Sequence, residues 1–315
     1  MSENISVEPL ARHIGALITG VDLRAPLSPA QVTAIREALV QWKVIFFRDQ
    51  HLSHDQHIAF ARQFGELTVG HPVFGSVQDY PHIYSVAKSR FGTRFEGARL
   101  FKPWTGWHTD VTAAINPPTA SILRGVTIPP YGGDTQWTSL EAAYDALSPT
   151  LRGFLETLRG EHRFTPPEGQ AGKREFHDQV KARELVSLHP LVRIHPESGR
   201  KSLFVSPGFL KRIDGLAPRE SEQLLALLFE HVIRPEFTVR FKWTEGAIAF
   251  WDNRSTAHLA PKDLADLPYD RQLYRTTLVG DVPVGVNGLT SEALAGEPVL
   301  AYNVDGAVAP SAETA

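Results

Sequence analysis

The segment Trp107–Asp110, with the sequence WHTD, places two potential metal ligands two positions apart. On an extended strand, residues two apart project to the same face, so His108 and Asp110 could bind one ion together. A second histidine, His258, follows the segment WDNR late in the chain. Two histidines and one carboxylate on one face of a metal form the facial triad of non-haem iron(II) oxygenases, which leaves adjacent coordination positions open. By itself, the His-x-Asp spacing also fits a hydrogen-bonded turn without a metal.

Two arginines, Arg271 and Arg275, follow His258 in the segment RQLYR. On a strand they would share a face, separated by roughly 13 Å of chain rise. The planar fork of arginine matches a carboxylate or sulfonate with two parallel hydrogen bonds. Two inward arginines would be costly without anionic partners, which favours one ligand anion for each. A pair of surface arginines on an edge strand is the alternative interpretation of this pattern.

The composition limits the classes of protein that these residues could serve. The chain has no cysteine among its 315 residues, so a metal would be bound by nitrogen and oxygen. The formal net charge of -3 gives no electrostatic basis for a nucleic-acid or anionic-membrane partner. The N-terminus lacks a basic segment followed by an apolar run, and no apolar stretch approaches membrane-spanning length. We therefore expect a cytoplasmic enzyme or binding protein.

Helix signals recur along the chain. Three expected helices start at a serine or threonine that is followed three residues later by glutamine or glutamate, the signature of a capping box. Three histidines flank the second helix, and we interpret them as a solvated face. The expected helices begin at Ser28, Ser53, Thr138 and Pro218, the last of them ending at Ile233, and the three histidines are His51, His54 and His57.

Short apolar or alternating segments predict strands between the helices. Phe237–Trp243 alternates apolar and polar residues, and further strands are expected at Lys43–Phe47, Ala247–Trp251 and Leu273–Val279. Many short strands with scattered helices and 23 prolines predict a mainly β fold with helical insertions, of the sandwich or jelly-roll type. We predict a single domain over residues 1–284 and a partly disordered C-terminal tail over residues 285–315, because the tail is small, polar and aperiodic.

Four segments of this chain resemble the taurine dioxygenase group, which also contains alkylsulfatase and phenoxyalkanoate dioxygenases. The similarity extends from about Val7 to Val284. The resemblance implies a double-stranded β-helix, or jelly roll, that uses Fe(II), 2-oxoglutarate and O2. The matching segments are WHTDVT (107–112), YGGDTQWT (131–138), WDNR (251–254) with His258, and RQLYRTTLVGD (271–281).

The resemblance also implies residue roles and a reaction. His108, Asp110 and His258 resemble the iron ligands, and Thr135 and Arg271 resemble the groups that bind the distal carboxylate of 2-oxoglutarate. Oxidative decarboxylation would release succinate and CO2 and hydroxylate a substrate C–H bond. The presence of Asp110 favours hydroxylation, because related halogenases lack this carboxylate. Relatives are often oligomers, so we expect a homo-oligomer.

The substrate pocket is expected to differ from that of the taurine enzymes. His71 and Arg275 resemble the residues that bind the sulfonate of taurine. Phe74 and Trp104 stand where those enzymes carry tyrosine and asparagine, which removes polar partners for an amine and adds apolar area. Phe204 is a further pocket candidate, with core packing as its alternative role. We therefore expect a small anionic substrate less polar than taurine: a sulfate ester, a sulfonate, or an aryl or alkyl carboxylate.

Other functions fit parts of the same pattern. A tailoring enzyme of secondary metabolism that hydroxylates or desaturates an amino-acid-derived substrate would use the same iron site. A non-catalytic metal-binding jelly roll and a zinc hydrolase are two further alternatives. Thr135 and Arg271 disfavour both alternatives, because neither a metal-binding protein nor a zinc hydrolase needs residues that bind the distal carboxylate of 2-oxoglutarate.

Overall fold

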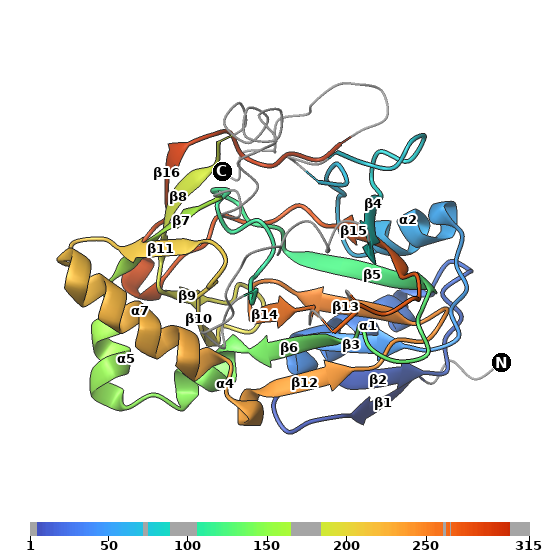
Figure 1. Ribbon diagram of the computed structural model, residues 1–315, viewed down its shortest axis with the longest axis horizontal. Coiled ribbons are helices and arrows are strands. Elements are labelled where there is room, and N and C mark those ends of the chain that lie inside the picture. Colours follow the sequence, from blue (N-terminus) through green and yellow to red (C-terminus); the bar gives the residue numbers. More distant parts are fainter. Residues whose placement is uncertain are drawn as a thin grey trace.

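A computed structural model of the chain describes residues 5–71, 75–88, 106–164, 184–260, 263–264 and 266–302. Phe74 and Trp104, two of the expected pocket residues, lie outside these ranges. Figure 1 shows strands stacked in layers through the middle of the molecule, with helices along the outside.

The helices begin where the local signals predict. The hydroxyls of Ser28 and Ser53 each accept a hydrogen bond from the backbone N–H of the glutamine three residues later. The backbone N–H of each serine in turn donates to the side-chain oxygen of that glutamine. The third expected helix starts later than predicted, because Ser139 caps it while Thr138 lies in a strand. Among the described helices, none combines the length and apolar character needed to cross a membrane. The bounds are α1 (Pro29–Trp42), α2 (His54–Arg62), α4 (Leu140–Asp145), α5 (Pro149–Leu155) and α7 (Pro218–Val232), with 3-10 turns η1 (Pro235–Phe237) and η2 (Val286–Gly288).

The largest sheet of the described chain has seven strands, in the order β1-β2-β3-β13-β5-β15-β4. Neighbouring strands run antiparallel except β2 and β3, which are parallel. The strands expected at Lys43–Phe47, Ala247–Trp251 and Leu273–Val279 correspond to β3, β13 and β15, with slightly shifted ends. The bounds are β1 (Ser6–Pro9), β2 (Ala16–Thr19), β3 (Val44–Phe47), β4 (Tyr84–Ala87), β5 (Ala120–Thr127), β13 (Ile248–Asp252) and β15 (Gln272–Thr277).

Strand β3 shows how both faces of this large sheet are buried. Ile45 and Phe47 point to one face and pack in a core with residues of α1 and α2. Val44 and Phe46 point to the other face and pack in a second core. The continuous apolar run VIFF therefore forms a strand with no solvated side.

A second sheet, in the order β12-β6-β14, packs on the inner face of the first. Trp137 of β6 meets Phe46 and Trp251 of the large sheet, with ring centroids 5.4 and 5.7 Å apart. Antiparallel sheets packed face to face over a common apolar core give the predicted jelly roll. The bounds are β6 (Thr135–Ser139), β12 (Thr238–Phe241) and β14 (Thr256–Leu259).

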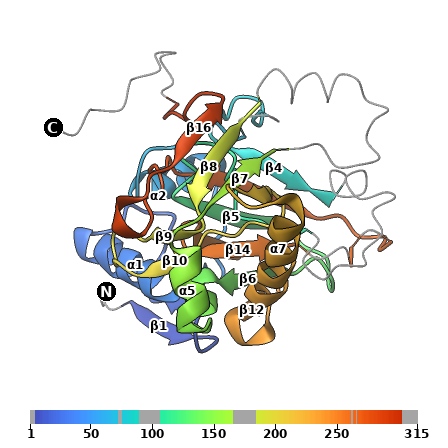
Figure 2. The ribbon, with the colours of Figure 1, turned by 90° about the vertical axis from the view of Figure 1, so that its left-hand side faces the viewer.

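A four-stranded sheet, β11-β7-β8-β16, lies with α5 and α7 at the end of the molecule away from β1 (Figures 1 and 2). Strand β16 belongs to the predicted tail and pairs with β8. Farther along, the N–H of Tyr302 donates to the carbonyl of Leu67 at 2.9 Å. The described part of the tail is thus anchored to the rest of the chain. The bounds are β7 (Arg159–Arg163), β8 (Val186–Pro190), β11 (Leu210–Ile213) and β16 (Glu292–Ala295), beside the hairpin of β9 (Val192–Ile194) and β10 (Lys201–Leu203).

His57, in α2, is fully buried, contrary to the solvated position predicted for it. Its Nε2 lies 3.3 Å from the hydroxyl of Thr276 in β15. Burial lowers the pKa of His57 to about 3. The helix therefore turns a neutral imidazole toward the large sheet.

Candidate metal centre

Backbone pairing brings His108 and His258 together. The N–H of His108 donates to the carbonyl of His258 at 2.9 Å, and the reverse bond measures 2.7 Å. The two imidazole centroids lie 4.3 Å apart. The main chain thus holds side by side two residues that are far apart in the sequence.

Asp110 follows His108 on a turn rather than on a strand. Within the segment Trp107–Asp110, His108 forms the isolated bridge and Asp110 lies in a turn. Between them, the N–H of Thr109 donates to the hydroxyl of Ser206 at 3.0 Å. The segment is therefore a bridge followed by a turn and not an extended strand, because contacts with remote residues shape it. The two candidate ligands nevertheless converge.

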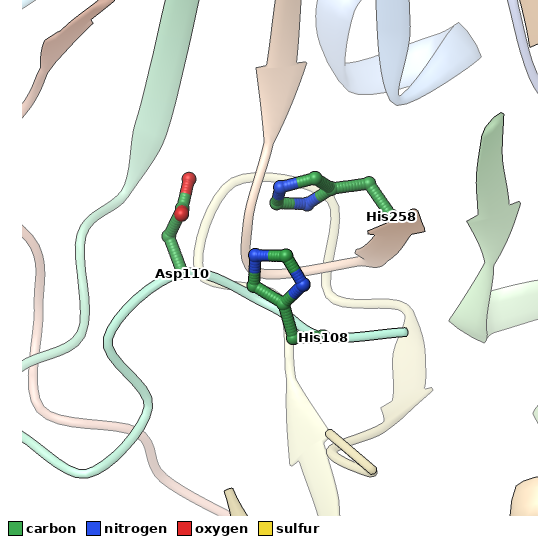
Figure 3. A group of neighbouring side chains, drawn as sticks. All are labelled: His108, Asp110 and His258. Atoms are coloured by element: carbon green, nitrogen blue, oxygen red, sulfur yellow. The ribbon is translucent and has the colours of Figure 1, made fainter. Parts of the chain in front are cut away.

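Figure 3 shows both imidazoles and the carboxylate turned toward one another. His108, Asp110 and His258 each offer one ligand atom, and these atoms all lie within 4.8 Å of one another. The Nδ1 of His108 lies 3.0 Å from the carbonyl of Gly106. Because a carbonyl can only accept, Nδ1 carries the proton and Nε2 presents its lone pair. Two imidazole nitrogens and one carboxylate oxygen form a donor set that suits iron(II), so these residues fit the expected ion.

The surroundings favour the ligand forms of Asp110 and His258. Burial alone would raise the pKa of Asp110, but the charge of Arg275 and the nearby histidines outweigh it, and the pKa lies well below its usual range. Burial, reinforced by the neighbouring His108, lowers the pKa of His258 to about 3. Near pH 7 the carboxylate is therefore ionised and the imidazole neutral, which are the forms that bind a metal.

Arg271 and Arg275 are buried at β15, with 4% and 8% of their surface exposed. This burial excludes the alternative of two surface arginines. Nη1 of Arg275 donates to Oδ1 of Asp110 at 2.5 Å, and its guanidinium lies 5.2 Å from the ring centroid of Tyr84. Burial lowers the pKa of Arg271 to about 10, so this side chain remains charged at neutral pH.

A glycine turn before Thr135 makes room for Arg271. Gly132 and Gly133 have φ values of +76° and +71°, and a Cβ at Gly133 would lie 2.9 Å from Cδ of Arg271. Thr135 then begins β6, and its hydroxyl accepts a hydrogen bond from Trp243 Nε1 at 2.9 Å. The hydroxyl proton can therefore be donated to another acceptor. In the segment YGGDT, Thr135 therefore lies two residues after Gly133, the glycine that adjoins Arg271.

Comparison with known proteins agrees with this arrangement. Residues 6–277 match the model of a protein family described as taurine catabolism dioxygenase TauD, TfdA family. The chain belongs to this family.

Individual relatives of this TauD/TfdA family member are similar over nearly their whole length. It is 40% identical over 295 residues to an alpha-ketoglutarate-dependent sulfate ester dioxygenase of Pseudomonas putida, covering 91% of this chain and 93% of the relative. It is 33% identical over 294 residues to an alpha-ketoglutarate-dependent 2,4-dichlorophenoxyacetate dioxygenase of Cupriavidus pinatubonensis, covering 89% and 100%. A crystal structure of a taurine dioxygenase from Burkholderia xenovorans matches with a TM-score of 0.83 and 60% identity, covering 94% and 96%. The predicted family, fold and enzyme class, an α-ketoglutarate-dependent (2-oxoglutarate-dependent) dioxygenase, are confirmed.

Tyr84 connects the two residues expected to bind the substrate anion of this TauD/TfdA protein. The ring centroid of His71 lies 5.0 Å from that of Tyr84, and the guanidinium of Arg275 lies 5.2 Å from the same ring. His71 precedes the gap in the described residues that contains Phe74. The ring of Tyr84 therefore contacts both candidate anion-binding residues, His71 and Arg275.

Phe204 lies in the buried core, as its alternative role requires. It is fully buried and packs on His162, with ring centroids 5.1 Å apart. Phe209 instead lies beside the centre, 6.4 Å from the His108 ring, and Phe164 lies 5.9 Å from Phe209. Phe209 could not be found from the sequence, because its place depends on a long-range backbone bond from the N–H of Gly208 to the carbonyl of Trp107.

Proposed function

We propose that the chain binds Fe(II) through His108, Asp110 and His258 and hydroxylates a small anionic organic substrate with O2 and α-ketoglutarate. The observation that carries this proposal is the convergence of the three ligand atoms within 4.8 Å, beside two buried arginines. A carboxylate and two neutral imidazoles leave adjacent coordination positions open, as oxygen chemistry with a chelating keto acid requires.

Each arginine has its own task in this proposal. Arg271, with the hydroxyl of Thr135, binds the distal carboxylate of α-ketoglutarate through a charged and bidentate contact. When bound, iron and the keto acid supply the oxidation of a substrate C–H bond, with succinate and CO2 released. The protein's residues orient the reactants in a buried site from which water is excluded.

The anionic end of the substrate is bound by Arg275 and His71. Phe209 and Phe164 add apolar surface on the side of His108, which favours a substrate with an apolar body. A sulfate ester, a sulfonate, or an aryl or alkyl carboxylate meets both conditions, and a relative that is 40% identical is named for sulfate esters. Hydroxylation at the carbon that bears a sulfate ester would give an unstable product, which collapses to an aldehyde and inorganic sulfate.

An anaerobic binding experiment followed by turnover tests this proposal. Fe(II) and α-ketoglutarate should give a weak visible charge-transfer band, which is lost in His108→Ala and weakened in Arg271→Ala. Sulfate esters, sulfonates and aryloxy acids are then supplied with O2, and succinate is measured. If the folded protein shows neither the band nor succinate, the dioxygenase proposal is wrong. The zinc hydrolase or the non-catalytic metal-binding protein is then favoured. Succinate formed only with amino-acid-derived substrates would indicate the tailoring enzyme.

Four further proposals concern the whole chain. We propose a single domain over residues 1–284, a homo-oligomer and a cytoplasmic location, without a nucleic-acid or membrane partner. Light scattering after size-exclusion chromatography measures the oligomeric state. Cell fractionation measures the location, and limited proteolysis measures whether cleavage is confined to the region after residue 284.

A further inference from the structure

A buried chain of hydrogen bonds leads from the large sheet to Asp110. Trp251 Nε1 donates to Asn253 Oδ1 at 2.9 Å. Asn253 Nδ2 donates to Ser121 Oγ at 3.0 Å, and Ser121 Oγ donates to Asp110 Oδ2 at 2.8 Å. The four residues expose at most 3% of their surface. We call these four residues the carboxylate relay.

The direction of every bond in the carboxylate relay is fixed by chemistry. An indole N–H can only donate, so Trp251 determines that the oxygen of the Asn253 amide faces it. The amide nitrogen then faces Ser121 and can only donate to it. The single hydroxyl proton of Ser121 is therefore left for Asp110, whose ionised carboxylate can only accept. The relay has one arrangement, and it ends on a candidate metal ligand.

Regular structure supports the relay at its other end. Ser121 in β5 and Trp251 in β13 are direct partners in the antiparallel register. The N–H of Asn253 donates to the carbonyl of Thr119 at 2.9 Å, which fixes its backbone to the start of β5. Asp110, by contrast, lies in a turn. The relay therefore connects a carboxylate on irregular backbone to the sheet.

We propose that Ser121 and Asn253 are positioning residues that fix the orientation of Asp110 for the metal. This inference rests on the proposed function, in which Asp110 is a ligand. Ser121 holds Oδ2 while Arg275 contacts Oδ1, so the plane of the carboxylate is set from both sides. Hydrogen bonds that orient a ligand typically change metal affinity by about 10- to 100-fold when they are removed.

Metal affinity of the full-length protein tests the proposal without relying on turnover. Mn(II) serves as the probe, because its free aquo ion gives an electron paramagnetic resonance signal that disappears on binding. We expect Ser121→Ala to weaken Mn(II) binding by about 10- to 100-fold and Asn253→Ala to weaken it by less, because a hydroxyl still faces Asp110. Ser121→Thr, which keeps the hydroxyl, should restore most of the affinity. Ser202→Ala is the matched control, since this serine is equally buried but lies in β10.

A double-mutant cycle separates positioning from general destabilisation. If Asn253 acts through Ser121, adding Asn253→Ala to Ser121→Ala should change Mn(II) affinity no further. Unfolding in the presence of a chelator shows which variants are folded. If Ser121→Ala does not fold, the Mn(II) affinity of Asn253→Ala alone tests the proposal. Unchanged Mn(II) affinity in the folded variants overturns the relay and leaves the proposed function intact. If the wild-type protein binds no Mn(II), as we expect for His108→Ala, both the carboxylate relay and the proposed function are overturned.

Discussion

Arg271, directly before β15, and Arg275, within β15, have neighbours that give them different chemistry. Arg271 lies against the glycine turn before Thr135, where a side chain at Gly133 would collide with it. Arg275 contacts Asp110 and lies over Tyr84. Four positions in the sequence therefore separate a candidate cosubstrate arginine from one that contacts a candidate metal ligand.

Replacing Arg271 by alanine should raise the KM for α-ketoglutarate by about 30-fold or more, because a buried charged contact is lost. Arg271→Lys should recover this only in part, since lysine lacks the planar fork. Steady-state kinetics with α-ketoglutarate as the varied reactant measures the effect. Arg212→Ala removes an arginine that is half exposed and paired with Glu161, and serves as control. An unchanged KM in Arg271→Ala would assign the distal carboxylate to another residue.

At the scale of elements, local signals were sufficient where the cause is local. The capping boxes at Ser28 and Ser53 predict the starts of α1 and α2, because the bonds involved span three residues. The strand predicted at Phe237–Trp243 is shorter than expected, since Phe237 lies in η1, but Val239, Phe241 and Trp243 are buried as the alternation predicts.

Elements that depend on remote partners could not be predicted in the same way. The WHTD segment is a bridge and a turn because it pairs with β14 and with the loop of Ser206. His57 is buried because α2 packs on β15, which is a contact with an element far away in the sequence. The candidate site was found from residue types and the family resemblance. The carboxylate relay was not, because its four members come from three separate parts of the chain.

Ser28→Ala should lower the free energy of unfolding by about 1 kcal/mol, the usual contribution of an N-cap serine. The variant loses the bond from the Gln31 N–H to the serine hydroxyl, which measures 3.3 Å. Thr33→Ala within the same helix is the matched control. It replaces an exposed threonine by a better helix former and should raise stability by a few tenths of a kcal/mol, roughly. Urea unfolding measures both, and equal effects would contradict the role of the cap.

At the scale of the whole molecule, the site lies where separate layers meet. His258 comes from the small inner sheet and Arg275 from the large sheet, while Asp110 lies on a turn outside both sheets. His57 in α2 and His189 in β8 are both fully buried. Burial lowers the pKa of each to about 3.

These buried histidines should make stability depend on pH in one direction. In the unfolded chain their pKa is about 6.5, so below that pH protons bind the unfolded state more readily. Stability is therefore fully present above about pH 6.5 and falls as the pH drops toward 3, by about 1.4 kcal/mol per pH unit for each histidine.

His57→Gln should reduce this pH slope by about 1.4 kcal/mol per unit between pH 6 and pH 4, whatever its effect at neutral pH. Denaturant unfolding at a series of pH values measures the slope. Phe60→Leu, in the same helix and also buried, should lower stability without changing the slope. A slope for His57→Gln equal to that of the wild type would show that His57 is not held neutral in the folded protein.

The antiparallel bridge between His108 and His258 also has a consequence for protein synthesis. The two residues are separated by nearly half of the chain. At a usual elongation rate, the ribosome needs on the order of ten seconds to advance from one to the other. During that interval a nascent chain holds two of the three candidate metal ligands, His108 and Asp110, and lacks strand β14, which carries the third. We expect the three candidate ligands to meet only after the chain has folded, so that any ion they bind is acquired after synthesis is complete.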